Sequence, residues 1–473
     1  MIEDLKPYPE YKESGQEWLG QVPGHWAVRR IKFVLREVDA RSTTGREQLL
    51  RVSQYTGVTE RKSADGSDAP DTRAASLKGY KIVRKGDLVI NIMLAWNGSL
   101  GVSRFDGIVS PAYCVYRLSS AVNGGYCHEL LRLPQYKGRI KAASTGVVES
   151  RLRLYSDDLG CIEAPLPPLA EQAAIGRFLD HWNGRLEKVI RAKRRVIALL
   201  QEQKQAIIHR AVTRGLDPNV KLKDSGIPWL GEIPEHWEVR QVKRVASFVT
   251  SGSRSWANFY SDDGLVFIQS GNLGRNMALN FSRTQHVRPP AGAEGERTRV
   301  NLNDVLVCIT GALTGNIVHV DQLHSDAPSY INQHIALVRP RPALIFPRFL
   351  AYALRSEIGQ SQFKTSEYGG TKQGLGLGDV KDVFLSLPSM TEQIAIVRSV
   401  DSSLDVFTTV IARYEREITL LREYRTRLTA DVVTGKVDVR AAAAQLPELG
   451  RDPVAAEAEG LEDEPEEGEA EEI

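Results

Sequence analysis

A long heptad pattern near the carboxyl end constrains the fold of this chain more than any other feature. From Thr391 to Gly435 apolar residues recur at alternating steps of three and four, and Arg425 interrupts the apolar seam. No proline or glycine occurs between residues 391 and 434, so the pattern predicts one continuous helix that packs against another helix. Ser389 to Glu392 fit a capping box at its start, and Gly435 fits a C-terminal stop.

A second copy of this pattern lies earlier in the chain. Glu392-Gln393 corresponds to Glu171-Gln172 at an offset of 392 − 171 = 221 residues. The first copy carries three polar seam residues, Asn183, Lys193 and Lys204. Because long helices seldom stand alone in water, we expect the two to pack on each other, with the polar residues fixing their register. A generic coiled coil is the alternative interpretation of either pattern taken alone.

The duplication extends beyond the helices. Residues 14–34 match residues 225–245 at 12 of 21 positions, including the box Trp-Leu-Gly-x-x-Pro-x-His-Trp. Short β-rich segments alternate with turns after each box, and Asp87 and Asp304 are interpreted as turn residues. The sequence therefore predicts an α+β fold in which two β-rich domains alternate with two long antiparallel helices, an internal repeat with pseudo-twofold symmetry. The N-terminal box should then pack near the end of the second helix.

These patterns give a division of the chain into five parts. The predicted ranges are 1–168 for the first β-rich domain with its N-terminal box, 169–215 for the first helix, 216–388 for the second β-rich domain, 389–440 for the second helix, and 441–473 for a disordered acidic tail. The prolines of residues 162–169 should end the first sheet region, and residues 58–76 should form an exposed polar loop.

Charge is distributed unevenly. Residues 454–473 contain ten acidic residues and no basic one, so residues 1–453 carry 61 − (59 − 10) = +12. A basic body suits a polyanionic partner, although a basic surface without such a partner remains an alternative. We expect no membrane-spanning segment, and we expect the four cysteines, which have no C-x-x-C spacing, to be buried reduced thiols of a cytoplasmic protein.

Motifs that carry chemistry are missing from the sequence. There is no G-x-x-x-x-G-K-[ST] phosphate loop, no H-E-x-x-H metal motif and no G-x-S-x-G nucleophile elbow. Ser110 to Tyr113 are only loosely similar to the Pro-Pro-aromatic motif of amino-methyltransferases, because the second proline and a glycine-rich cofactor loop are absent. The sequence therefore favours a binding role over catalysis by this chain.

The paired boxes, the helix entries Leu-Pro-Pro-Leu-Ala-Glu-Gln and Leu-Pro-Ser-Met-Thr-Glu-Gln, and the turn Gly86-Asp87-Leu88-Val89 together resemble the specificity subunit of type I restriction–modification systems. This resemblance covers residues 14–440. It implies two target-recognition domains that each read half of a bipartite, asymmetric duplex DNA target, and two helices that act as a spacer. It also implies docking of two methyltransferase subunits, association with restriction subunits, and use of S-adenosylmethionine, ATP and Mg²⁺ in those partner subunits rather than here.

Base reading needs polar side chains on loops that reach base edges. The candidates in the first domain are Arg61, Lys62, Arg73, Asn97, Ser99, Arg151 and Arg153, and those in the second are Arg254, Gln269, Asn272, Arg275, Lys372 and Gln373. Each of them has an alternative interpretation as a solvated loop residue. A protein-interaction scaffold and a self-contained DNA methyltransferase or nuclease remain alternatives for the whole chain, and the sequence does not give the target bases.

Overall fold

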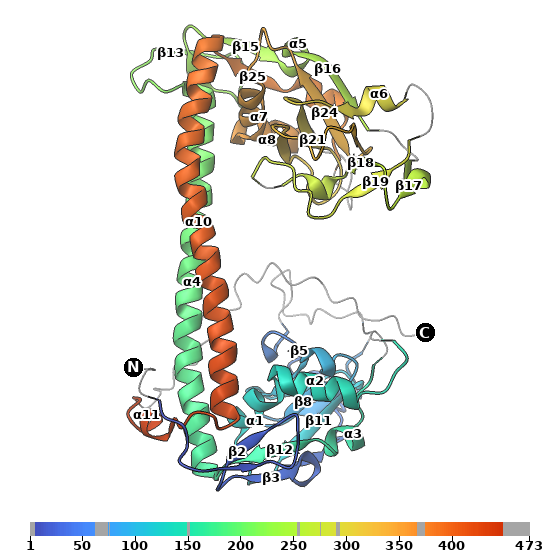
Figure 1. Ribbon diagram of the computed structural model, residues 1–473, viewed down its shortest axis with the longest axis vertical. Coiled ribbons are helices and arrows are strands. Elements are labelled where there is room, and N and C mark those ends of the chain that lie inside the picture. The colour runs from blue at the N-terminus through green and yellow to red at the C-terminus, as the bar shows by residue number, and fades with distance from the viewer. Residues whose placement is uncertain are drawn as a thin grey trace. The chain divides into compact units, whose positions relative to one another are not determined.

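The computed structural model describes residues 5–61, 74, 76–148, 152–252, 256–274, 276–289, 294–366 and 374–447. The chain divides into two compact units (Figure 1). Unit 1 comprises residues 1–193 and 416–473, and unit 2 comprises residues 194–415. Both long helices contribute to both units, because α4 spans Leu169–Arg214 and α10 spans Met390–Val433.

The described residues of unit 1 form short strands, short helices and parts of both long helices. Its further elements are β1 (Tyr11–Glu13), β2 (Gln21–Pro23), β3 (Ala27–Arg30), η1 (Ile31–Phe33), β4 (Leu35–Glu37), β5 (Leu50–Ser53), β6 (Gly57–Glu60), β7 (Lys81–Val83), β8 (Leu88–Asn91), η2 (Ala95–Asn97), β9 (Leu100–Val102), β10 (Gly107–Val109), β11 (Tyr113–Leu118), α1 (Gly124–Leu131), α2 (Pro134–Ala143), α3 (Ser156–Gly160), β12 (Glu163–Leu166) and the terminal α11 (Arg440–Ala444).

Unit 2 repeats this order with additional strands. Its elements are β13 (Leu222–Asp224), β14 (Glu232–Pro234), β15 (Glu238–Gln241), α5 (Val242–Val245), β16 (Ala246–Ser251), η4 (Trp256–Phe259), β17 (Tyr260–Ser261), β18 (Leu265–Ile268), η5 (Ser270–Asn272), β19 (Gln285–Val287), α6 (Glu294–Thr298), β20 (Arg299–Val300), β21 (Val305–Cys308), β22 (Ile317–His319), β23 (Ser329–Ile331), β24 (Ile335–Pro340), α7 (Pro347–Arg355), α8 (Glu357–Ser366), α9 (Leu377–Asp382) and β25 (Phe384–Leu387).

The sheets confirm the internal duplication. The central antiparallel sheet has the order β4-β11-β8-β9 in unit 1 and β16-β24-β21-β22 in unit 2. The strand that follows each box pairs with the strand that precedes a long helix, β3 with β12 and β15 with β25. The outer strands differ, because unit 1 has two-stranded ribbons where unit 2 has a five-stranded sheet, β17-β19-β18-β23-β20. A common scaffold therefore carries different peripheral structure in the two units.

The turn interpretation of Asp87 and Asp304 is confirmed. Their carboxylates accept hydrogen bonds from the backbone N–H groups of Arg84 at 2.9 Å and Asn301 at 2.8 Å. Each aspartate also forms an ion pair with an arginine of the neighbouring strand, at 3.2 Å for Arg117 and 2.8 Å for Arg339. The buried aspartates therefore close the turn, and the neighbouring arginines balance their negative charge.

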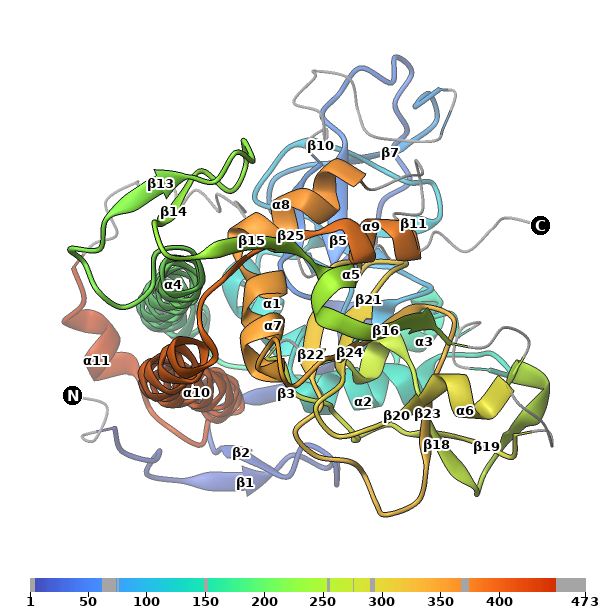
Figure 2. The same cartoon turned by 90° about the horizontal axis from the view of Figure 1, so that it is seen from above.

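The two long helices pack antiparallel within each unit (Figures 1 and 2). In unit 1, Lys193 contacts Glu417 at 2.6 Å and Glu187 contacts Arg425 at 3.4 Å, so the residue number rises on one helix as it falls on the other. The apolar seam residues are buried or half-buried along both helices, as the heptad spacing predicts. The polar seam residue Lys204 donates to Thr408 Oγ1 at 2.9 Å, whereas Asn183 Oδ1 is buried without a hydrogen-bond partner.

A buried glutamate joins the N-terminal box to the start of α4. Glu171 accepts hydrogen bonds from the Tyr8 hydroxyl at 2.5 Å, His25 Nε2 at 2.8 Å and Trp26 Nε1 at 2.9 Å. The neighbouring Gln172 donates to Ala121 O and Pro167 O and accepts from Asn123 N. Glu171 and Gln172 therefore connect the N-terminal box, α4 and the segment before α1 through hydrogen bonds; we call this set of contacts the joint of unit 1.

Unit 2 repeats this joint with one donor fewer among the described contacts. Glu392 accepts from His236 Nε2 at 3.1 Å and Trp237 Nε1 at 3.0 Å. Gln393 accepts from Phe346 N and donates to Leu344 O and Pro388 O. Half of the predicted capping box forms here: Ser389 Oγ accepts from Glu392 N at 3.3 Å, but the Glu392 carboxylate binds the indole and imidazole.

The N-terminal box packs at the end of α10, as predicted. Gly435 has φ +79°, and a Cβ atom there would lie 2.4 Å from Pro23 and 2.9 Å from Trp26. Lys6 pairs with Asp438 in an isolated bridge. The predicted start of the disordered tail at residue 441 is wrong, because α11 covers residues 440–444 and buries Ala443 and the preceding Val439 in unit 1. Residues 448–473 lie outside the described part of the chain.

Several local expectations also need correction. Residues 58–60 are not an exposed loop: they belong to β6, which pairs with β5, and Val58 is buried. Residues 62–73 and 75 lie outside the described residues. Pro165 lies within β12, a strand with a partner on one side only, where its missing N–H is tolerated. Cys161 is exposed at the C-terminus of α3, although all four cysteines are free thiols.

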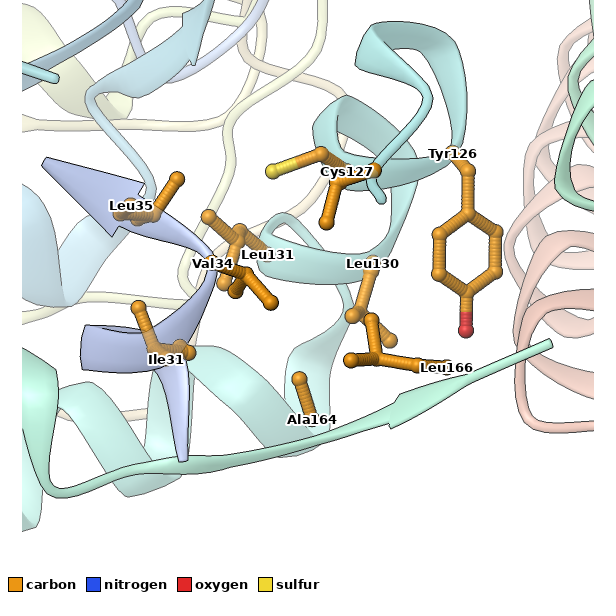
Figure 3. A pocket seen from close by; sticks show the side chains of 10 residues that line it. Ile31, Val34, Leu35, Tyr126, Cys127, Leu130, Leu131, Ala164 and Leu166 are labelled. Atoms are coloured by element: carbon orange, nitrogen blue, oxygen red, sulfur yellow. The ribbon is translucent and has the colours of Figure 1, made fainter. Parts of the chain in front are cut away.

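A small cavity lies inside unit 1 between η1, α1 and β12 (Figure 3). Its volume is about 20 Å³, and apolar side chains such as Ile31, Leu130 and Leu166 surround it. The Tyr126 hydroxyl beside it donates to Pro165 O at 2.8 Å, and Val433 O lies 3.3 Å from the same hydroxyl oxygen. A space of this size holds about one water molecule, so this cavity is a packing gap rather than a ligand site.

Candidate nucleic-acid interface

Four of the seven candidates in the first domain lie in described segments. Asn97 ends η2, and its Oδ1 accepts from Ser99 N at 3.0 Å and Ser99 Oγ at 2.9 Å. Ser99 is fully buried, so its hydroxyl orders this loop and does not face solvent. Arg153 is exposed and pairs through its backbone with Thr145. Arg61 follows β6, and its N–H donates to Leu49 O. Lys62, Arg73 and Arg151 lie outside the described residues.

Two of the six candidates in the second domain lie in described segments. Gln269 is half-buried, and its Nε2 donates to the Tyr260 hydroxyl at 3.0 Å. Asn272 is 6% exposed, and its Nδ2 donates to Asn280 O and Arg283 O. Asn272 therefore holds the turn together instead of presenting its amide to solvent. The remaining candidates, Arg254, Arg275, Lys372 and Gln373, lie outside the described residues.

The structure brings some candidates together. In unit 1 the segment after β8 meets the segment after α2, because Leu154 N donates to Ile92 O at 3.0 Å. Asn97 and Arg153 therefore belong to adjoining loops. Unit 2 makes the equivalent contact, in which Leu375 N donates to Ile309 O at 2.8 Å. Both units thus place a loop that follows a central strand next to a segment that follows a helix.

Arg132 was not among the candidates, yet it makes the densest set of contacts in this region. It follows α1, and its guanidinium donates to the carbonyl oxygens of two loops: Gln54 (2.8 Å), Tyr55 (2.9 Å) and Ser53 (3.4 Å) in one, and Leu100 (2.8 Å) and Gly98 (3.1 Å) in the other. Burial lowers the pKa of the Arg132 guanidinium, and Glu129 opposes this shift. Nothing in the local sequence distinguishes Arg132 from a surface arginine at a helix end.

Arg355 occupies the corresponding position in unit 2. Asn123 N and Phe346 N, which bind the two equivalent glutamines, are 346 − 123 = 223 residues apart, and 355 − 132 is also 223. Arg355 donates to Asn316 Oδ1 at 3.0 Å, and Asn316 Nδ2 donates to Leu273 O at 2.7 Å. Burial lowers the pKa of the Arg355 guanidinium as well. The internal duplication could have indicated that these two arginines form a pair.

The described residues form neither a metal centre nor a membrane-spanning helix. Within them, no three or more His, Cys, Asp or Glu side chains gather in a way that could hold a metal ion. None of the described helices combines the length and apolar composition needed to cross a membrane. In the described residues, each unit is a folded scaffold whose surface loops are held in place by hydrogen bonds.

No family model matches the sequence. The type I restriction enzyme MjaVIII specificity subunit of Methanocaldococcus jannaschii is 22% identical over 444 residues, which cover 91% of this chain and 97% of that protein. The EcoBI specificity subunit of Escherichia coli is 27% identical over 281 residues, which cover 57% of this chain and 56% of that protein.

The fold is similar to that of a solved structure described as the structural basis of complex assembly and conformational transition of the type I R-M system. The TM-score is 0.62 at 18% sequence identity, and the match covers 87% of this chain and 98% of the other. The two-domain arrangement with paired long helices therefore agrees with a fold already observed.

Proposed function

We propose that this chain, a homologue of the specificity subunits of type I restriction enzymes, binds duplex DNA sequence-specifically and reads a bipartite, asymmetric target. The observation that supports the proposal best is that the two units share a central sheet but differ in their outer strands. The same four-stranded sheet occurs in both units, but the outer strands form the two-stranded ribbons β5-β6 and β10-β7 in unit 1 and a five-stranded sheet in unit 2. Equal scaffolds with different loops suit two different half-sites.

We further propose that the two long helices act as a spacer between the half-sites and as a docking surface for partner subunits. α4 and α10 are unbroken over 46 and 44 residues, so the length of the helices would set the gap between half-sites. Several large apolar side chains remain exposed on them: Val189, Val196 and Leu199 on α4, and Val406, Leu420 and Tyr424 on α10. Exposed apolar side chains on helices favour contact with other proteins. We assign this contact to two methyltransferase subunits, with restriction subunits joining the complex.

Catalysis is assigned to the partner subunits. S-adenosylmethionine, ATP and Mg²⁺ would act there, and the present chain would supply recognition. The basic charge of residues 1–453 supports phosphate contacts, which position a protein on DNA without reading its sequence.

The test is a binding and methylation assay with the chain alone and with its co-purified methyltransferase. We expect binding to duplex DNA that weakens steeply between ~50 and ~200 mM salt, because phosphate contacts release counterions. We expect methyl transfer only when the methyltransferase is present. Methyl transfer or DNA cleavage by the isolated chain would support a self-contained enzyme, and salt-insensitive or absent binding by the complex would support a protein scaffold.

A further inference from the structure

We infer that Arg132 and Arg355 are positioning residues for DNA recognition, each fixing the arrangement of the surface loops in its own unit. This inference rests on the proposed function and deepens it. Neither residue was selected as a base-reading candidate, and neither needs to touch DNA for the role argued here. The role is to hold other side chains in place.

The contacts of Arg132 connect two loops that are separate in sequence. One is the turn between β5 and β6, where Tyr55 is 57% exposed. The other is the loop between β8 and β9, which carries the candidate Asn97. Five carbonyl oxygens from these loops converge on one guanidinium. Moving either loop would break charge-assisted hydrogen bonds in a desolvated setting, where they are stronger than in water.

Only an arginine fits this geometry. A guanidinium has five N–H donors in a rigid planar fork, whereas a lysine ammonium has three donors at a single point. The two terminal nitrogens of Arg132 divide their contacts: Nη2 donates to Gln54 and Tyr55, and Nη1 donates to Gly98 and Leu100, with Ser53 O as a longer third contact at 3.4 Å. A lysine would keep the charge but would not span both loops.

Unit 2 makes the same connection through different chemistry. Arg355 donates to the side chain of Asn316, in the loop after β21, and Asn316 donates to the carbonyl of Leu273. Leu273 follows the η5 turn, to which the candidate Gln269 is bonded through Asn272. Gln360 adds a second tie by donating to Gly315 O at 2.9 Å. The arginine position is therefore retained while the loops that it joins have changed.

Each arginine therefore connects the part of the fold that the two units share with the surface loops that differ between them. Arg132 follows α1 and Arg355 ends α7, and both helices pack in the core of their unit. Each arginine extends from that core to the carbonyl or amide groups of the loops. A substitution should therefore alter the reading of one half-site without altering the other.

The experiment uses the full-length chain with its co-purified methyltransferase and duplex libraries in which one half-site is randomised at a time. The variants are Arg132→Met and Arg355→Met, and each serves as the control for the other. We expect each variant to lose roughly tenfold in base discrimination at one half-site and to change by less than about twofold at the other. The affected half-site should differ between the two variants.

Folding is monitored by limited proteolysis, and two milder variants keep the inference testable if a methionine variant does not fold. Arg132→Lys retains the charge and should lose part of the discrimination at the half-site read by unit 1. Asn316→Ala retains Arg355 but breaks its connection to Leu273, so it should weaken discrimination at the half-site read by unit 2. Folded milder variants that keep full discrimination would overturn the inference.

The remaining outcomes separate this inference from the proposed function. Paired motifs that persist unchanged in folded Arg132→Met and Arg355→Met would overturn the positioning role alone. Equal weakening of both half-sites by either variant would indicate a general loss of structure and would also overturn it. If the unmodified complex selects no paired motifs, the proposed function fails, and the inference fails with it.

Discussion

The indole nitrogen of Trp26 donates a hydrogen bond of 2.9 Å to Oε1 of Glu171, a residue 145 positions later in the chain. Trp237 makes the same bond of 3.0 Å to Glu392 across 155 positions. In each unit, the box therefore binds the first turn of a long helix through a hydrogen bond to a carboxylate. These bonds connect segments that are distant in sequence.

This joint predicts unequal effects of two equivalent substitutions. The Glu171 side chain is 4% exposed and has three donors, whereas that of Glu392 is 29% exposed and has two. Glu171→Ala should lower the free energy of unfolding of unit 1 by about 3 kcal/mol, because it leaves buried donors unsatisfied. Glu392→Ala should cost about 1–2 kcal/mol in unit 2. Hydrogen exchange resolved along the chain measures both effects, and equal losses of protection would contradict this account.

One substitution in the seam between the long helices should stabilise the chain. Asn183 Oδ1 is buried without a partner, and the equivalent position in α10, 183 + 221 = 404, is Leu404. Asn183→Leu should therefore stabilise the chain by about 1 kcal/mol, because an unsatisfied polar group is replaced by an apolar one. Leu404→Asn is the reciprocal control and should destabilise. Denaturant unfolding of both variants measures these changes; a less stable Asn183→Leu variant would show that the amide is needed in the seam.

A buried histidine predicts how stability depends on pH. His128 accepts a hydrogen bond from Val102 N at Nδ1, and burial, with a smaller effect of Arg132, lowers its pKa to about 3. The unfolded chain binds a proton near pH 6.5, so the contribution of His128 to stability is complete above that pH and is lost as the pH falls toward 3.

The substitution His128→Asn tests this relationship, because an asparagine Oδ1 can accept from Val102 N without titrating. The variant should flatten the decline in unfolding free energy of unit 1 between about pH 6.5 and 3. His324→Asn, at an exposed histidine of unit 2, serves as the control. An unchanged pH profile in His128→Asn would refute the role given to burial of the imidazole.

The acidic tail should weaken DNA binding. Removing residues 454–473 raises the formal net charge from +2 to +12, so we expect tighter binding at low salt and a difference that shrinks as salt is added. A tail of equal length with its acidic residues changed to Gln and Asn is the control and should behave like the deletion. Identical affinities of all three proteins at low salt would show that the tail does not compete with DNA.

The base-reading candidates give a prediction for each unit. Asn97→Ala should relax base preference in one half-site, and Gln269→Ala in the other, each by about 1–3 kcal/mol. Discrimination is measured by competition between matched and mismatched duplexes. Unchanged discrimination in both variants would remove these two residues from the candidate interface.

Periodicity predicted the parts of this fold that are regular. The steps between Val397 and Val432 predicted α10 almost to its ends, and the repeated box predicted two copies of one β-rich domain, which share a sheet order. Side-chain direction was not predictable in the same way. Ser99 and Asn272 are polar loop residues, but their side chains point inward because nearby carbonyl and amide groups need partners. Arg132 was missed because its acceptors are backbone oxygens, which leave no pattern in the sequence.

Selection from random duplex DNA, using the chain with its co-purified methyltransferase, tests the central claim most directly. The account predicts enrichment of two different short motifs separated by one fixed gap, because two unlike sets of loops are carried on one pair of continuous helices. A single contiguous motif, or no enrichment by a folded complex, would contradict bipartite recognition.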